Sequence, residues 1–354
     1  MTLSALRQLV HSVIVFLFFL PGCACVWQNE AFAKHPTYLK RLQTAAHTPV
    51  SLHSALLRTR THVYAIVTKA AVRQNHMRNF VTTALQLPFD DTNHSSPFDL
   101  VAAVEISPQT PFHSFVLSGV LSWDYNATWR HQRMNRGRLA CQLSLVHTLQ
   151  LFLNSSHKHA LIFEDDVAVT GGLSSEDARS LTAQMLQLPG KQWDVQYLGY
   201  CHSCQSRGSL HASGWLSDDV IALCAHAIVF NRKAAATFLR RWSPIHVPGD
   251  NKLTHVICQT GLKVLRPVLP IFDQDRSIGL SQTGTKNKPL LPFLEPDLCR
   301  ARQMNCPSVL AAQVPPPPRV AARSWFGNSG RGEGKNRGRG SAGSIGVRGR
   351  ARPS

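Results

Sequence analysis

The sequence predicts an α/β protein, and three stretches of the chain support that prediction. Residues 62–67 are a run of β-branched and aromatic side chains, which is typical of a buried strand. Over 139–153, leucine and valine recur at steps of three and four, as on one face of an amphipathic helix. Residues 160–163 are apolar and lead directly into three acids. Strands that alternate with helices favour a layered α/β architecture.

The remaining elements follow from the same kinds of pattern. Short apolar runs indicate strands, helical composition or spacing indicates helices, and clusters of Pro, Ser and Asn indicate loops. In chain order we expect a helix over 69–86, a strand over 98–104, a long loop over 105–135, a turn over 154–159, a helix from Ser175, strands over 192–198 and 225–230, and a helix over 233–242.

The N-terminus has the residue order of a targeting segment. Arg7 precedes an apolar run over 9–20, and small residues follow up to Ala24, which is a plausible cleavage position. The run is shorter than the roughly 20 apolar residues of a membrane span, but residues 26–27 lengthen it. We therefore predict that residues 1–24 are a signal peptide or a signal anchor, and that the protein enters the secretory pathway. It would reside in the ER or Golgi lumen or be secreted, with membrane contact only if the segment is not cleaved.

Glycosylation motifs and cysteines agree with a lumenal location. Asn-x-Ser/Thr sequons occur at Asn93, Asn126 and Asn154. Of the nine cysteines, eight would remain after cleavage behind Ala24, and in an oxidising compartment we expect them to form disulfides.

A zinc site is the alternative for some of these cysteines. Cys201 and Cys204 have the Cys-x₂-Cys spacing of zinc sites, and Cys224 and His226 follow. Disulfides remain the favoured interpretation for a lumenal protein.

The positive charge of the chain is concentrated at its C-terminus. The formal net charge is +18, and residues 315–354 contribute +8 of it through nine Lys or Arg against one acid. This stretch is rich in Pro, Gly and Arg and has almost no large apolar residues, so we expect it to be disordered. Such a tail could bind RNA, although a signal peptide would separate it from RNA and nucleic acid is disfavoured as a partner. The basic body suits a phosphate-bearing ligand.

The three acids that follow the apolar strand are the main candidate site. Glu164, Asp165 and Asp166 lie at the carboxyl end of a strand, where open α/β sheets bind their ligands. Carboxylate oxygens are preferred by Mg²⁺ and Mn²⁺. Glu164 and Asp166 are one residue apart and can point at one ion, whereas Asp165 faces the other way or contacts a ribose. The alternative is a solvated turn in which an Asp caps the next helix.

An ordered series of sequence blocks runs through the middle of the chain. The blocks are Gly137 with Cys141-Gln-Leu-Ser144, then 160–167, 193–199 and 226–234, followed by 247–253 and a closing strand over 270–274. Over about residues 62–282, this series resembles glycosyltransferase family 25, which includes bacterial lipooligosaccharide galactosyltransferases and procollagen galactosyltransferases.

The resemblance implies a GT-A-like nucleotide-binding α/β/α sandwich with a mixed sheet. It implies a nucleotide-sugar donor, with UDP-galactose favoured, a hydroxyl acceptor on a glycan or protein, and a Mn²⁺ or Mg²⁺ cofactor. Position by position, Glu164 and Asp166 match the metal motif and Asp165 the donor motif. After its first strand the family usually has Asn-Leu and then a pair of arginines. Here Thr68 follows the strand and Arg73 is the nearby arginine, and both are further candidates for donor binding.

Two further residues are candidates from this resemblance. Asp250 lies in a Val-Pro-Gly-Asp segment that we interpret as a loop, and we expect it to act as the catalytic base; a turn-forming Asp is the alternative. His226 is a candidate donor contact, and a packed, hydrogen-bonded histidine is its alternative.

The predicted organisation places one glycosyltransferase domain between extensions. A stalk or N-terminal extension is expected over 25–58, the glycosyltransferase domain over 59–284, a C-terminal extension over 285–314 and the disordered tail over 315–354. A non-catalytic relative that binds glycans or proteins is the alternative function, because Thr68 and Leu145 stand where the family pattern has other residues.

Overall fold

A computed structural model describes most of the central part of the chain. The described residues are 36–47, 50–88, 97–123, 134–200, 202–203, 215–217, 222–245 and 249–278. Several predictions lie outside these residues, namely those for the signal segment 1–24, the C-terminal extension 285–314, the tail 315–354, Asn93, Asn126, Cys201 and Cys204.

The core is a mixed, mostly parallel sheet, which confirms the predicted α/β class. Its strand order is β2-β1-β3-β9-β5-β10-β7, and β9 runs antiparallel to both of its neighbours. A further strand, β11, pairs in parallel with β5 and antiparallel with β4, and β6 pairs with β8 in a separate small sheet. The bounds are β1 Thr61–Val67, β2 Phe98–Ala102, β3 His159–Glu164, β4 Val167–Val169, β5 Val195–Gly199, β6 His202–Ser203, β7 Leu216–Ser217, β8 Ala222–Leu223, β9 Ala227–Asn231, β10 Val264–Pro267 and β11 Phe272–Gln274.

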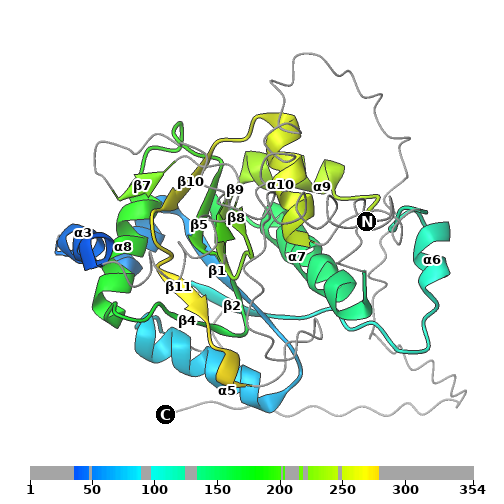
Figure 1. The fold of residues 1–354 in the computed structure, drawn as a ribbon, viewed down its shortest axis with the longest axis horizontal. Helices are drawn as coiled ribbons and strands as arrows, with labels where there is room; N and C mark the ends of the chain where they lie inside the picture. The colour runs from blue at the N-terminus through cyan, green and yellow to red at the C-terminus, as the bar shows by residue number, and fades with distance from the viewer. Residues whose placement is uncertain are drawn as a thin grey trace, which may run out of the picture. The chain divides into compact units, whose positions relative to one another are not determined.

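Helices cover both faces of this sheet. Figure 1 shows α3 and α8 on one side and α7, α9 and α10 on the other. Alternate residues of a strand point to opposite faces, and β1 follows this rule: Val63 and Ala65 join one apolar cluster and Tyr64 joins the other. The bounds are α3 Pro36–Ala46, α4 Leu52–Thr59, α5 Ala71–Asn79, the π-helix η1 Phe80–Ala84, α6 Phe112–Leu117, α7 Arg136–Asn154, α8 Ser175–Gln187, α9 Arg232–Arg241, α10 Gly249–Thr260 and the 3₁₀-helix η2 Arg276–Ile278.

Part of the predicted stalk or N-terminal extension contributes to the core. Helices α3 and α4 both contact α8, and Leu42, Leu52 and Leu56 are buried in the same apolar cluster as the sheet. The side chain of Gln184 also donates a hydrogen bond to the carbonyl of Ala45 at 2.8 Å. Residues 36–47 and 50–59 therefore belong structurally with the domain that follows them.

Most predicted helices and strands are present, with two corrections. The segment 105–135, expected to be a loop, contains α6, and the segment around Asp250 is the start of α10 rather than a loop. The sequence patterns also did not reveal β4 and β10, which are only three and four residues long. Within the described ranges, no helix has the length and apolar character needed to cross a membrane.

The connections between strands create a switch point beside β1. From β1 the chain passes through α5 to β2 on one side, and then returns through α7 to β3 on the other side. The two connecting helices lie on opposite faces, because Met77 of α5 and Val146 of α7 belong to different apolar clusters. In open α/β sheets, such a point opens a crevice at the carboxyl ends of the strands. The candidate site is therefore expected at the ends of β1 and β3.

Candidate metal and donor site at the carboxyl end of the sheet

The three acids lie at this switch point. Glu164 is the last residue of β3, opposite Ile66 of β1, and its N–H donates to the carbonyl of His226 on the other side at 3.0 Å. Asp165 and Asp166 form the turn that leads into β4. The acids thus project from a strand that is fixed by its neighbours on both sides.

Asp165 joins the end of β3 to the end of β1. Its Oδ2 accepts hydrogen bonds from the N–H and the hydroxyl of Thr68 at 3.0 and 2.9 Å, and its Oδ1 pairs with the guanidinium of Arg73. All three residues are buried. Both oxygens of Asp165 are therefore used within the protein. Thr68 and Arg73 act here by holding Asp165.

Glu164 and Asp166 converge on a common position. The amide nitrogen of Gln274 lies 3.4 Å from Oε2 of Glu164 and 3.5 Å from Oδ1 of Asp166. The other Glu164 oxygen, Oε1, lies 3.6 Å from the sulfur of Cys141 on α7. Because an amide can present its oxygen or its nitrogen after a half-turn, Gln274 can also offer an acceptor at this position.

Burial and mutual repulsion make this pair of carboxylates hold protons unusually well. Burial, followed by the charge of Asp166, raises the pKa of Glu164 from 4.5 to about 8. Burial also raises the pKa of Asp166, although the charge of Arg73 opposes the shift. Asp165 and Asp250 add further negative charge. Without a cation the pair therefore tends to keep protons, and a bound cation would favour the charged carboxylates by displacing them.

The residues fit a metal that is shared with a phosphate-bearing ligand. Among the residues that the structure describes, no group of three or more His, Cys, Asp or Glu is arranged to hold a metal ion. Glu164 and Asp166 alone provide two carboxylates. Mg²⁺ is commonly bound by one or two carboxylates together with substrate phosphates and waters. The pair fits that mode of binding and does not fit a closed protein cage.

Asp250 lies in a helix and not in the predicted loop. It is in the first turn of α10, where negative side chains are favoured by the helix dipole. Its Oδ2 accepts from the N–H of Cys224 at 3.2 Å and its Oδ1 from the N–H of Asn251 at 2.8 Å. Its charge contributes to the raised pKa of Glu164, which places its carboxylate in the electrostatic environment of the cluster.

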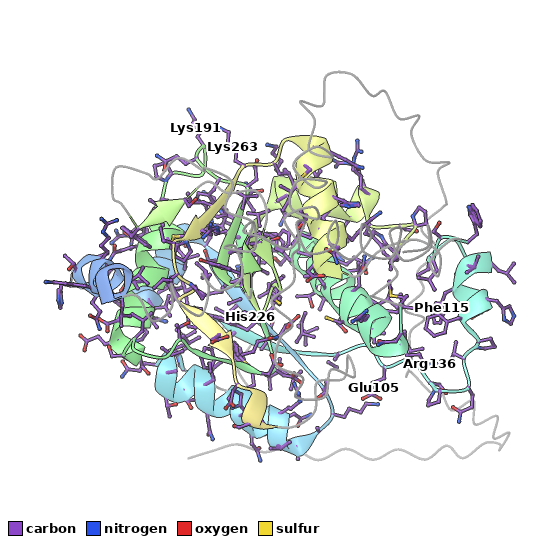
Figure 2. All side chains as sticks on the ribbon, viewed as in Figure 1. Glu105, Phe115, Arg136, Lys191, His226 and Lys263 are labelled. Carbon is purple, nitrogen blue, oxygen red and sulfur yellow. The ribbon has the colours of Figure 1, made fainter. Side chains whose placement is uncertain are left out.

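His226 lies in the interior of the protein (Figure 2), and its carbonyl is next to Glu164 at the end of β3. Its side chain is fully buried, and Nε2 lies 2.9 Å from the carbonyl oxygen of Phe272 on β11. Gly199 makes room for the ring, because a Cβ at this position would lie 2.5 Å from Cδ2 of His226. The structure therefore favours the packed histidine over a donor contact.

Among the described residues, two cysteines are disulfide-bonded and a third is a free thiol. Cys224 and Cys258 are each disulfide-bonded, so Cys224 does not provide the thiolate that the zinc alternative requires. Cys141 is free, and burial together with the charge of Glu164 raises the pKa of its thiol. Cys141 and Gln274 are the residues of this site that the sequence analysis did not select as site residues.

No protein-family model and no curated protein matches the chain.

Proposed function

We propose that this chain is a metal-dependent glycosyltransferase with a GT-A-like domain. In this proposal it transfers a hexose, with galactose favoured, from a nucleotide-sugar donor to a hydroxyl on a glycan or protein. The observation that carries the proposal is the convergence of Glu164 and Asp166, both with raised pKa values, at the switch point of the sheet. A donor diphosphate would add negative charge beside acids that resist ionisation, so a divalent cation that displaces their protons is needed between them.

The acids have separate roles in this proposal. Glu164 and Asp166 hold the Mn²⁺ or Mg²⁺, and Asp165 keeps the end of β3 in place through Thr68 and Arg73. When bound, the metal would act as a Lewis acid that stabilises the departing diphosphate. Arg73 Nη1 is 3.8 Å from Oδ2 of Asp166, so its charge also restrains that carboxylate.

Asp250 is the proposed base for the acceptor. The bond between the anomeric carbon and the diphosphate oxygen breaks, and a bond from the acceptor oxygen to the anomeric carbon forms. If the reaction inverts the anomeric centre, the hydroxyl proton passes to a base. Asp250 is a carboxylate that is only partly buried and lies close enough to Glu164 to influence its pKa.

A lumenal location is part of the proposal. The N-terminal residue pattern, the sequons and the disulfide-bonded Cys224 and Cys258 all suit an oxidising secretory compartment. The resemblance of the ordered sequence blocks to glycosyltransferase family 25 supports a glycosyltransferase.

Turnover of a panel of nucleotide sugars, with and without Mn²⁺, tests the proposal. We expect donor hydrolysis or transfer that requires Mn²⁺, and an Asp166→Asn variant should lose at least about 100-fold in rate, as when a group that stabilises transition-state charge is removed. Glu176→Gln is the matched control, because Glu176 is an exposed acid of α8. Metal-independent turnover, or full turnover by Asp166→Asn, would contradict the proposal. Donor binding without turnover would indicate the non-catalytic relative.

A further inference from the structure

A cavity of about 390 Å³ lies at the end of the sheet opposite the acidic cluster. Asp194 immediately precedes β5, Lys263 immediately precedes β10, and Asn231 ends the antiparallel β9, so the cavity lies at the amino end of the parallel strands. Its volume is within the usual range of small-molecule sites, which is roughly 300–1,000 Å³. The lining residues are Gly190, Lys191, Asp194, Asn231, Lys233 and Lys263.

The charges in this cavity leave two lysines available to an anion. Asp194 accepts hydrogen bonds from the ammonium of Lys233 at 2.9 Å, from the N–H of Lys263 at 3.0 Å and from the amide of Asn231 at 3.1 Å. Although burial acts against it, these hydrogen bonds lower the pKa of Asp194, which is therefore ionised. The carboxylate balances Lys233. Lys191 and Lys263 then provide a net positive charge.

These two lysines are held next to each other. The ammonium of Lys263 donates to the carbonyl oxygen of Lys191 at 2.7 Å, and Figure 2 shows both side chains at the same edge of the fold. Both residues are exposed. Beside them, Gly190 has open space where a Cβ would be, so a ligand can approach its backbone. The arrangement offers two ammonium groups over a concave polar surface.

We propose that this cavity binds a saccharide that carries an oxyanion, either a sulfate or a phosphate. Its lining contains neither an aromatic nor an aliphatic side chain. Such a surface has nothing to stack on a nucleobase and nothing to cover a lipid chain. Each lysine ammonium has three donors, so the lysines and the Gly190 backbone can hydrogen-bond to an oxyanion and to sugar hydroxyls, whereas Asp194 and Asn231 are already paired within the protein. The cavity is also distinct from the proposed transfer site, because Glu164 lies at the opposite end of the sheet.

Calorimetric titration with charged and uncharged saccharides tests this proposal. The probes are a sulfated disaccharide, a phosphorylated hexose and their uncharged parents, at low ionic strength and with chelator and no donor present. We expect saturable binding of the sulfated or the phosphorylated probe and no binding of the uncharged parents. Which of the two charged probes binds identifies the oxyanion. Added salt should weaken that binding, because exposed charges are screened. Omission of donor and metal makes the result independent of transfer activity.

Paired variants assign the binding to the cavity. Lys191→Gln with Lys263→Gln should weaken binding by about tenfold or more, equivalent to about 1.4 kcal/mol. Replacement of the same two lysines by Arg should preserve binding. Lys40→Gln with Arg41→Gln removes two charges from exposed positions of α3 and should change nothing. The proposal is overturned if neither charged probe binds, if both paired Gln variants lose affinity equally, or if these lysines bind anionic lipid vesicles but no saccharide.

Discussion

The two ends of the central sheet carry opposite charges in opposite environments. At the carboxyl end, Glu164, Asp165, Asp166 and Asp250 are buried or partly buried, and Arg73 pairs with Asp165 and Asp166. At the amino end, the lysines around the cavity are exposed and the one acid among them is buried. Buried charge is costly and shifts pKa values, whereas exposed charge is solvated and screened. The acidic end is therefore suited to chemistry and the basic end to docking.

The comparison is sharpest for two ion pairs. In the Arg73–Asp165 pair both side chains are 9% exposed, while in the Lys233–Asp194 pair the lysine is 67% exposed and the acid 6%. Both pairs bring opposite charges into contact. Only the first removes both charges from water, so only the first should be strongly destabilised when its cation is lost.

The largest expected effect is the loss of Arg73. Arg73→Met should lower the free energy of unfolding by about 3–5 kcal/mol, because it leaves Asp165 charged and unbalanced in the interior. Urea denaturation at neutral pH measures this loss. The double variant Arg73→Met with Asp165→Leu should recover much of it, since the buried charge is then gone. A single variant within about 1 kcal/mol of the parent would mean that the two ends of the sheet do not differ as described.

The next effect is on the pH dependence of stability. The pKa of Glu164 rises from 4.5 to about 8 in the folded protein, so in this interval the folded state retains a proton that the unfolded state releases. The free energy of unfolding should therefore fall as pH rises from 4.5 to about 8, by up to about 1.4 kcal/mol per pH unit.

Urea denaturation between pH 5 and pH 8, without metal, measures this slope in the parent and in Glu164→Gln. The variant should show a flatter dependence and should be more stable than the parent at the upper end of the range. Parallel curves for the two proteins would show that Glu164 is not the group that holds the proton.

The smallest effect is expected at the basic end. Lys233→Met should cost less than about 1 kcal/mol in unfolding free energy, because the lysine is mostly solvated and Asp194 keeps its hydrogen bonds from Lys263 and Asn231. The same urea experiment used for Arg73→Met measures it. A loss as large as that of Arg73→Met would remove the distinction between the two ion pairs.

The fold could be predicted from the sequence where buried residues recur with the period of a strand or a helix. The strand over 62–67 and the helix face of Leu139, Val146 and Leu149 are buried as expected. Helix α10 was missed because its buried residues include Asn251, Lys252 and Thr254, which hide the apolar period. The ammonium of Lys252 is accommodated by a hydrogen bond to the carbonyl of Pro244 at 3.0 Å, a contact that no local pattern indicates.

The part of the site that lies next to a predicted strand in the sequence was also predictable. Glu164, Asp165 and Asp166 follow a strand directly, so their position at its end could be read from the chain. Gln274 is 110 residues from Glu164 and reaches it only because β11 pairs with β4 and β5. That pairing depends on the whole sheet. The folded surroundings of His226, including the space left by Gly199, are equally non-local.

The most direct test of the account is Mn²⁺ binding measured by electron paramagnetic resonance, in the presence of UDP, as a function of pH. The account predicts that Mn²⁺ binds more tightly at pH 8 than at pH 6, because metal must displace protons from Glu164 and Asp166. Glu164→Gln with Asp166→Asn should abolish both the binding and its pH dependence. Equal Mn²⁺ affinity in the parent and this double variant would contradict the account.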